Sequence, residues 1–246
     1  MELDSDGVRI HYELHGPSTG RPVVLVHGYA SDYPLNWVGT RWQETLTTAG
    51  YRVVGLDCRG HGRSDKPHDP AAYALQTMAA DVGRLLDHLE IETADYIGYS
   101  MGARIGLQAM LDLGARLRRA VLGGVGWGGA FHESEEIARA MRGEATSSAV
   151  AKSFFEFASA RPINDLEALA ACILGPQPDL NEARLNAIKI PVLVVVGELD
   201  DIVGKVDRLV KSIAHAKLVT IAGRNHMSAV PAREFKQAAL EFLAAG

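Results

Sequence analysis

Six short runs of apolar, mostly β-branched residues recur along the chain, and helical patterns separate most of them. The runs cover residues 22–28, 51–57, 95–100, 119–124, 191–197 and 217–223. Most are apolar throughout rather than alternating, which is typical of strands that are buried on both faces of a parallel sheet. Strand and helix in alternation favour βαβ crossovers. The sequence therefore predicts an α/β fold with a mostly parallel, doubly wound sheet.

A seventh run, near the N-terminus, alternates between apolar and polar residues. Four apolar side chains fall on one of its faces: Val8, Ile10, Tyr12 and Leu14. This alternation predicts an antiparallel N-terminal strand at an edge of the sheet. Between the runs, helical patterns occupy residues 77–89, 101–113, 204–214 and 231–244.

The interval 126–189 breaks the alternation of strand and helix. It contains no convincing strand, and its helical patterns lie at residues 133–142, 149–160 and 165–174. A structureless loop of that length is implausible inside a compact domain. We therefore predict a helical cap, or lid, at residues 126–189. It is inserted into an α/β core that residues 1–125 and 190–246 form together.

Composition excludes several classes of protein. The chain has 246 residues, of which 47% are hydrophobic and 22% charged, and its net charge is −5. These values are ordinary for a soluble globule and disfavour a nucleic-acid partner. Two cysteines cannot build a disulfide framework. The acidic first residues do not resemble a signal peptide, and no apolar stretch approaches the roughly 20 residues of a membrane span. We expect a cytoplasmic protein without a membrane partner; the sequence does not indicate its oligomeric state.

Residues 98–102, Gly-Tyr-Ser-Met-Gly, match the pattern G-x-S-x-G. The motif follows an apolar strand and opens a helical pattern, as a nucleophile elbow does. Its two glycines leave space for a sharp strand-to-helix turn. The serine hydroxyl then projects from the C-terminal edge of the sheet, near the positive end of the helix. The motif therefore predicts Ser100 as a nucleophile.

A serine nucleophile needs a base, and the base needs a carboxylate that fixes its tautomer. Of the nine histidines, only His226 follows all the predicted strands. The buried run 191–197 is followed by Glu198, Asp200 and Asp201. We select Asp200 as the acid and keep Asp201 as its competitor.

A developing oxyanion needs two N–H donors that are already in position. The backbone N–H of Met101, directly after the nucleophile, is one candidate. The second is the N–H of Tyr29, which lies in the loop after the run 22–28. We expect His27 to shape that loop rather than to act as a base.

Five segments together resemble the α/β-hydrolase superfamily, in its small-capped, esterase-like branch. They are HGY (27–29), DCRGHGRSDKP (57–67), GYSMG (98–102), GELD (197–200) and GRNH (223–226). The order serine, aspartate, histidine is also the order of this superfamily. The resemblance implies that Ser100, Asp200 and His226 form a triad, that Tyr29 and Met101 are the oxyanion donors, and that the inserted helices form a lid. It also implies a structural role for Arg59, His61 and Asp65.

These features predict a serine hydrolase that cleaves a small acyl substrate, most simply a carboxylic ester, through an acyl-enzyme and without a cofactor or metal. The same triad also serves thioesterases, carbon–carbon bond hydrolases, perhydrolases and a menaquinone-pathway lyase, and some members of the fold only bind a ligand. Epoxide hydrolases and haloalkane dehalogenases use an aspartate where this chain has Ser100. Arg104, Phe154 and Phe155 are candidates for the substrate pocket, although each could serve packing alone. Specificity itself is not readable from the fold.

Overall fold

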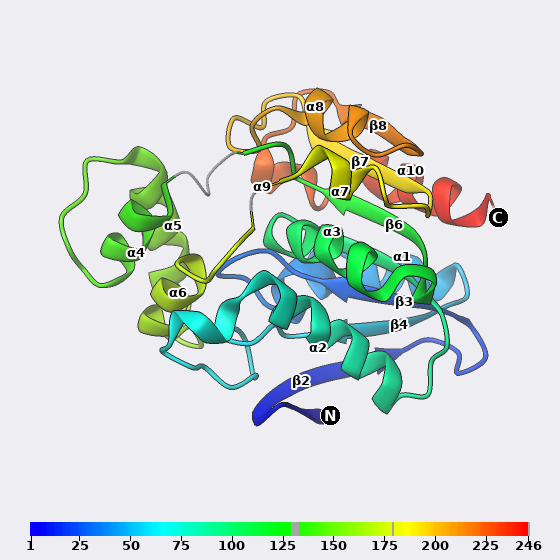
Figure 1. The fold of residues 1–246 in the computed structure, drawn as a ribbon, viewed down its shortest axis with the longest axis horizontal. Coiled ribbons are helices and arrows are strands. Elements are labelled where there is room, and N and C mark those ends of the chain that lie inside the picture. Colours follow the sequence, from blue (N-terminus) through cyan, green and yellow to red (C-terminus); the bar gives the residue numbers. More distant parts are fainter. Residues whose placement is uncertain (129–132, 179, 246) are drawn as a thin grey trace.

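The computed structural model describes residues 1–128, 133–178 and 180–245, and its core is one twisted sheet (Figure 1). The eight strands of the described residues lie in the order β1-β2-β4-β3-β5-β6-β7-β8. Their bounds are β1 Glu2–Ser5, β2 Val8–His15, β3 Arg21–Val26, β4 Tyr51–Leu56, β5 Ala94–Tyr99, β6 Leu117–Gly123, β7 Val192–Gly197 and β8 Ala216–Ile221. Strands β4, β3, β5, β6, β7 and β8 pair in parallel, which confirms the predicted fold class.

The N-terminal strands are antiparallel, but their order differs from the expectation. Strand β2 pairs with β4 on one side and with β1 on the other, so β1 is the edge strand and β2 is not. Strand β1 has only four residues, and just Leu3 and Ser5 are buried. So short a run, with acidic residues between its inward-facing positions, gives almost no periodic signal.

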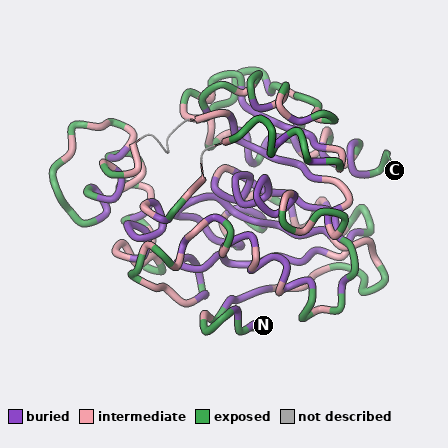
Figure 2. Tube along the Cα trace, in the orientation of Figure 1, coloured by how far each residue is buried: buried purple, intermediate pink, exposed green. Residues whose placement is uncertain are grey.

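Both faces of the sheet are covered, and alternate residues of each strand belong to different cores. Val24 and Val26 of β3 face a core with helices α2 (Leu75–His88), α3 (Met101–Leu113) and α8 (Val206–Lys211). Val23 and Leu25 face the core under α1 (Trp42–Thr48) and α10 (Arg233–Ala244). Figure 2 shows the central strands, β3 to β7, buried along most of their length. Burial on both faces explains why these strands are apolar throughout.

Between β6 and β7, the described residues form four helices: α4 (Ser134–Met141), α5 (Ala149–Ser159), α6 (Leu166–Ile173) and α7 (Glu182–Leu185). The first three lie together at one end of the molecule (Figure 1). Side chains cap the starts of α5 and α6, since Ser148 accepts from Ala151 N–H and Asp165 from Ala168 N–H, both at 3.0 Å. Helix α7 instead packs against α3. The division of the chain at residues 126 and 189 stays a prediction. Among the described residues, no helix combines the length and apolar character needed to cross a bilayer.

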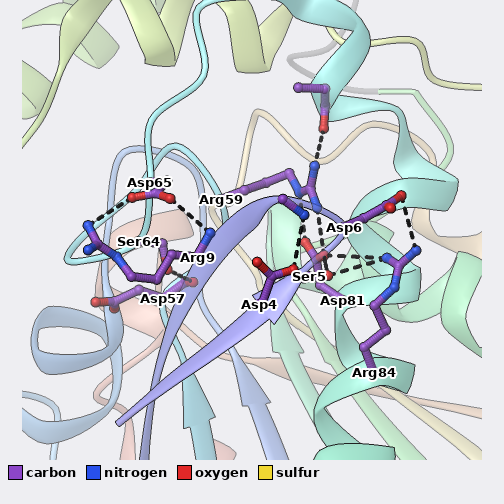
Figure 3. A network of polar contacts seen from close by, with 12 residues as sticks. Asp4, Ser5, Asp6, Arg9, Asp57, Arg59, Ser64, Asp65, Asp81 and Arg84 are labelled. Carbon is purple, nitrogen blue, oxygen red and sulfur yellow. Dashed lines mark hydrogen bonds and ion pairs between the residues drawn. The ribbon is translucent and has the colours of Figure 1, made fainter.

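The segment that follows β4 anchors this end of the core (Figure 3). Arg59 makes two hydrogen bonds to buried Asp81, at 2.8 and 2.7 Å. Asp65 accepts from the backbone and side chain of Arg9, at 2.9 and 2.8 Å. Asp57 accepts from the backbone N–H of Tyr33 at 2.8 Å, which ties the loop after β3 to the end of β4. These contacts give Arg59 and Asp65 the structural role that the resemblance implies.

Candidate active site

Ser100 sits in a sharp turn between β5 and α3, with φ 54° and ψ −112°. A Cβ at Gly98 would lie 2.4 Å from the Gly102 carbonyl oxygen, and a Cβ at Gly102 would lie 2.1 Å from that of Val26. Both glycines are therefore required by close backbone contact. The N–H of Ser100 donates to the Gly123 carbonyl at 2.8 Å, which fixes the turn against β6. Left-handed backbone at a non-glycine residue is strained, and such strain concentrates at functional sites.

His226 begins the short helix α9 (His226–Ala229), and its ring contacts Asp200. Nδ1 donates to Asp200 Oδ2 at 2.8 Å; the aspartate side chain is fully buried and the histidine side chain is 12% exposed. Asp201 is exposed, and the carboxylate that the His226 ring contacts is that of Asp200. Because a carboxylate only accepts, the proton of a neutral His226 lies on Nδ1, and Nε2 is left as the basic nitrogen. The geometry distinguishes Asp200 from its competitor.

Two residues that sequence reasoning did not single out hold the His226 ring. Tyr99 lies against it with ring centroids 5.2 Å apart, and the Tyr99 hydroxyl donates to the His226 carbonyl oxygen. A Cβ at Gly124 would lie 2.9 Å from His226 Cε1. The glycine at position 124, directly after β6, therefore makes room for the imidazole. The sequence could have pointed to Tyr99, because it directly precedes Ser100 inside the G-x-S-x-G motif.

The two candidate oxyanion donors lie close to Ser100. Met101 is the first residue of α3, and the loop after β3 passes beside Ser100, since a Cβ at Gly28 would lie 3.4 Å from the Ser100 Cβ. In the part of the chain that the structure describes, the backbone N–H groups of Tyr29 and Met101 have no protein acceptor. Two N–H groups beside a serine, both available, can stabilise a developing oxyanion.

His27 holds this loop from within the core. Its Nδ1 donates to the Gly28 carbonyl at 2.8 Å, and its Nε2 accepts from the Cys58 N–H at 2.9 Å. Burial lowers the pKa of His27, which keeps the ring neutral. Asn36 adds a second support, because its Oδ1 accepts from the Gly28 N–H at 3.1 Å. The expected structural role of His27 is therefore visible in its contacts.

Helix α6 and the segment between α5 and α6 hold the same loop from the other side. Arg161, between α5 and α6, forms an ion pair with buried Asp32. The Asn164 amide donates to the Ala30 carbonyl at 3.3 Å, where Ala30 has φ 56°. The Tyr29 hydroxyl donates to the Leu169 carbonyl of α6 at 2.8 Å. We call this segment, residues 27–32, the oxyanion loop after its candidate donor Tyr29. It lies between α6 and the core, and no local sequence motif predicted these contacts.

Ser100 and His226 line one cavity of about 520 Å³, together with Tyr29, Phe154 and Phe157. They also line a recess of about 30 Å³ with Arg104 and Phe154. Phe155 belongs to neither lining and packs against the hydrophobic core. Arg104 is buried, which lowers its pKa to about 10, and its Nε donates to Gln177 Oε1 at 3.2 Å. Among the described residues, no group of three His, Cys, Asp or Glu could hold a metal ion.

Comparison with known proteins identifies the family of the chain. The model of the alpha/beta hydrolase fold family matches residues 21–175, which is more than half of the chain. The chain belongs to the α/β-hydrolase fold family. A solved hydrolase from Pseudomonas aeruginosa PA01 is similar to it over 100% of this chain and 98% of its own, with TM-score 0.82 and 28% identity.

Two curated relatives of this α/β hydrolase match over shorter stretches. One is a non-heme chloroperoxidase of Streptomyces lividans, 41% identical over 40% of this chain and 34% of its own length. Another is epoxide hydrolase B of Mycobacterium tuberculosis (strain H37Rv), 39% identical over 42% of this chain and 29% of its own. The chain thus aligns to less than half the length of these curated relatives.

Proposed function

We propose that this α/β hydrolase is an enzyme that cleaves carboxylic esters through an acyl-Ser100 intermediate. One observation carries the proposal: a histidine that donates to a fully buried aspartate lines the same cavity as a serine in a strained elbow. A serine hydroxyl is a weak nucleophile unless a base takes its proton, and a buried carboxylate orients that base. The arrangement joins all three requirements in one place.

In the proposed reaction, Ser100 Oγ attacks the ester carbonyl carbon while His226 Nε2 takes its proton. The N–H groups of Tyr29 and Met101 stabilise the oxyanion, and Asp200 stabilises the imidazolium. The tetrahedral intermediate then collapses: the bond to the alkoxy oxygen breaks, and His226 gives its proton to the departing alcohol. Water, deprotonated by His226, attacks the acyl-serine and releases the carboxylic acid with the enzyme restored.

The same triad supports other acyl acceptors and leaving groups. Thioester hydrolysis changes only the leaving atom, and perhydrolysis replaces water by hydrogen peroxide as acceptor. The similarity to a protein named as a chloroperoxidase makes peroxide a worthwhile second acceptor to test. Carbon–carbon hydrolysis and lyase chemistry use the same histidine. An ester remains the simplest substrate, because its chemistry needs no group beyond those that line the cavity.

The test compares Ser100→Ala with Ser153→Ala on p-nitrophenyl esters. Ser153 lines the same cavity but lies on α5, away from the strained turn that holds Ser100, so its replacement controls for a general change of the cavity. We expect Ser100→Ala to lower turnover by about 10⁶-fold and to abolish labelling by a fluorophosphonate, whereas Ser153→Ala keeps both. Ester hydrolysis within tenfold of the unmodified enzyme in Ser100→Ala would refute the mechanism. The same variants are then assayed with thioesters as substrates and with hydrogen peroxide as the acyl acceptor. The rates show which of these reactions the enzyme favours.

A further inference from the structure

Ser100 stands at the boundary between two spaces of very different size. The larger cavity, of about 520 Å³, and the recess, of about 30 Å³, share Tyr29, Ser100, Phe154, Ile202 and His226 in their linings. An ester bound at Ser100 has two halves, the acyl group and the alcohol. The acyl group therefore occupies one of the two spaces and the alcohol the other.

Buried apolar side chains from four parts of the chain line the recess, together with the buried side chain of Arg104. Val125 follows β6, Ile137 lies on α4, Ile173 ends α6, and Val203 precedes α8; all four line the recess and are buried. The larger cavity, in contrast, has exposed residues in its lining, such as Met227, which is 57% exposed. The larger cavity opens to solvent, and the recess extends into the protein.

The order of events in acyl transfer assigns the two halves. The alcohol must leave before water can attack, while the acyl group stays bonded to Ser100. An alcohol held in the recess would be trapped behind the acyl-serine. On the assumption of the proposed ester hydrolysis, we propose that the recess is the acyl site and that the open cavity holds the leaving alcohol.

The volumes then name the substrate class. The recess, at about 30 Å³, is far smaller than the open cavity, at about 520 Å³. A group that enters the recess must therefore be much smaller than one that enters the open cavity. The open cavity lies in the range of sites for whole small molecules. Its lining includes Leu35, Val150, Phe157 and Val230. The substrate is therefore a short-chain ester, acetate or propionate, of a large apolar alcohol.

The experiment measures kcat/KM for p-nitrophenyl acetate, butyrate and hexanoate after titration of active sites with a fluorophosphonate. An added methylene that a pocket cannot accept costs about 10–200-fold in kcat/KM. We therefore expect acetate to exceed butyrate by at least tenfold. Ile137→Ala, which enlarges the recess, should raise the butyrate-to-acetate ratio at least tenfold.

Val150→Ala is the matched control, because Val150 also lies in the cap but lines only the larger cavity. It should leave the acyl ratio within threefold and lower the preference for naphthyl over phenyl acetate. Because the readouts are ratios, partial misfolding of a variant does not change them. Equal rates on all acyl lengths would overturn the acyl assignment, and so would an acyl ratio that changes in Val150→Ala instead of Ile137→Ala. Preference for a monosuccinate ester would also overturn it, because its carboxylate would show that Arg104 in the recess selects an acidic acyl group. No labelling and no hydrolysis of any ester would instead refute the proposed function itself.

Discussion

Replacing Asp200 by asparagine tests the polarity of the hydrogen bond on which the proposed mechanism depends. Asp200 Oδ2 accepts from His226 Nδ1 at 2.8 Å, and its Oδ1 accepts from the Ile202 N–H at 3.3 Å. In the variant, the amide oxygen stays at the Ile202 N–H, so the amide NH₂ faces Nδ1. The imidazole must then accept at Nδ1 and carry its proton on Nε2, where it cannot take the proton of Ser100. We expect kcat to fall by about 10⁴-fold, which corresponds to about 5.4 kcal/mol of activation free energy.

Asp201→Asn provides the control, since this neighbour carries the same charge, lines the cavity and is exposed. Its kcat should stay within threefold of the unmodified enzyme. Steady-state hydrolysis of p-nitrophenyl acetate and the rate of fluorophosphonate labelling measure both variants. Asparagine has nearly the volume of aspartate, so thermal unfolding should confirm that Asp200→Asn is folded. A kcat within tenfold for Asp200→Asn, or a large loss in Asp201→Asn instead, would show that Asp200 is not the acid.

Three further predictions concern contacts around the site. Arg161→Met leaves buried Asp32 without its ion pair and loosens the oxyanion loop. We therefore expect kcat to fall 10- to 100-fold while KM stays within threefold, and Arg161→Lys to recover part of the lost kcat. Arg59→Met should lower the free energy of unfolding by about 3–5 kcal/mol in urea titration, because it leaves Asp81 charged inside the core. Burial lowers the pKa of His61 to about 3 in the folded protein, whereas a free histidine titrates at about 6.5. As the pH falls, the unfolded chain therefore binds a proton at His61 before the folded protein does. Stability is then complete above about pH 6.5 and falls toward pH 3, by about 2 kcal/mol at pH 5, and His61→Gln should flatten this dependence in urea titrations.

The parallel strands and the serine elbow were predictable because their signals are local. Burial on both faces forces a continuous apolar run, and close backbone contact forces glycine at positions 98 and 102. Helix α1 was missed for the opposite reason. Its N-cap, Arg41, has φ 65° and makes no capping hydrogen bond, so the helix begins without a recognisable start.

The cavity lining was partly readable, although the prediction selected the wrong neighbour of Phe154. Residues 150, 153, 154 and 157 all line the larger cavity, and their spacing is i, i+3, i+4, i+7 of one helical face. Phe155 is rotated away from that face and packs against the core. Applying helical periodicity to 149–160 would have favoured Phe157. The ion pair between Asp32 and Arg161 gave no such signal, because it joins residues 129 apart in sequence.

Helix α6 both supports the loop that carries Tyr29 and forms part of the wall of the recess. A substitution on this helix therefore cannot test acyl selectivity alone. Helix α6 supplies both the Leu169 carbonyl that holds the Tyr29 hydroxyl and Ile173 in the wall of the recess. A smaller residue at 173 would enlarge the recess and also loosen the helix that supports an oxyanion donor. Ile137 also lines the recess, but it lies on α4, whereas the Tyr29 hydroxyl is held by α6. Ile137→Ala should therefore change acyl selectivity while keeping kcat on acetate, whereas Ile173→Ala should lower kcat on every ester.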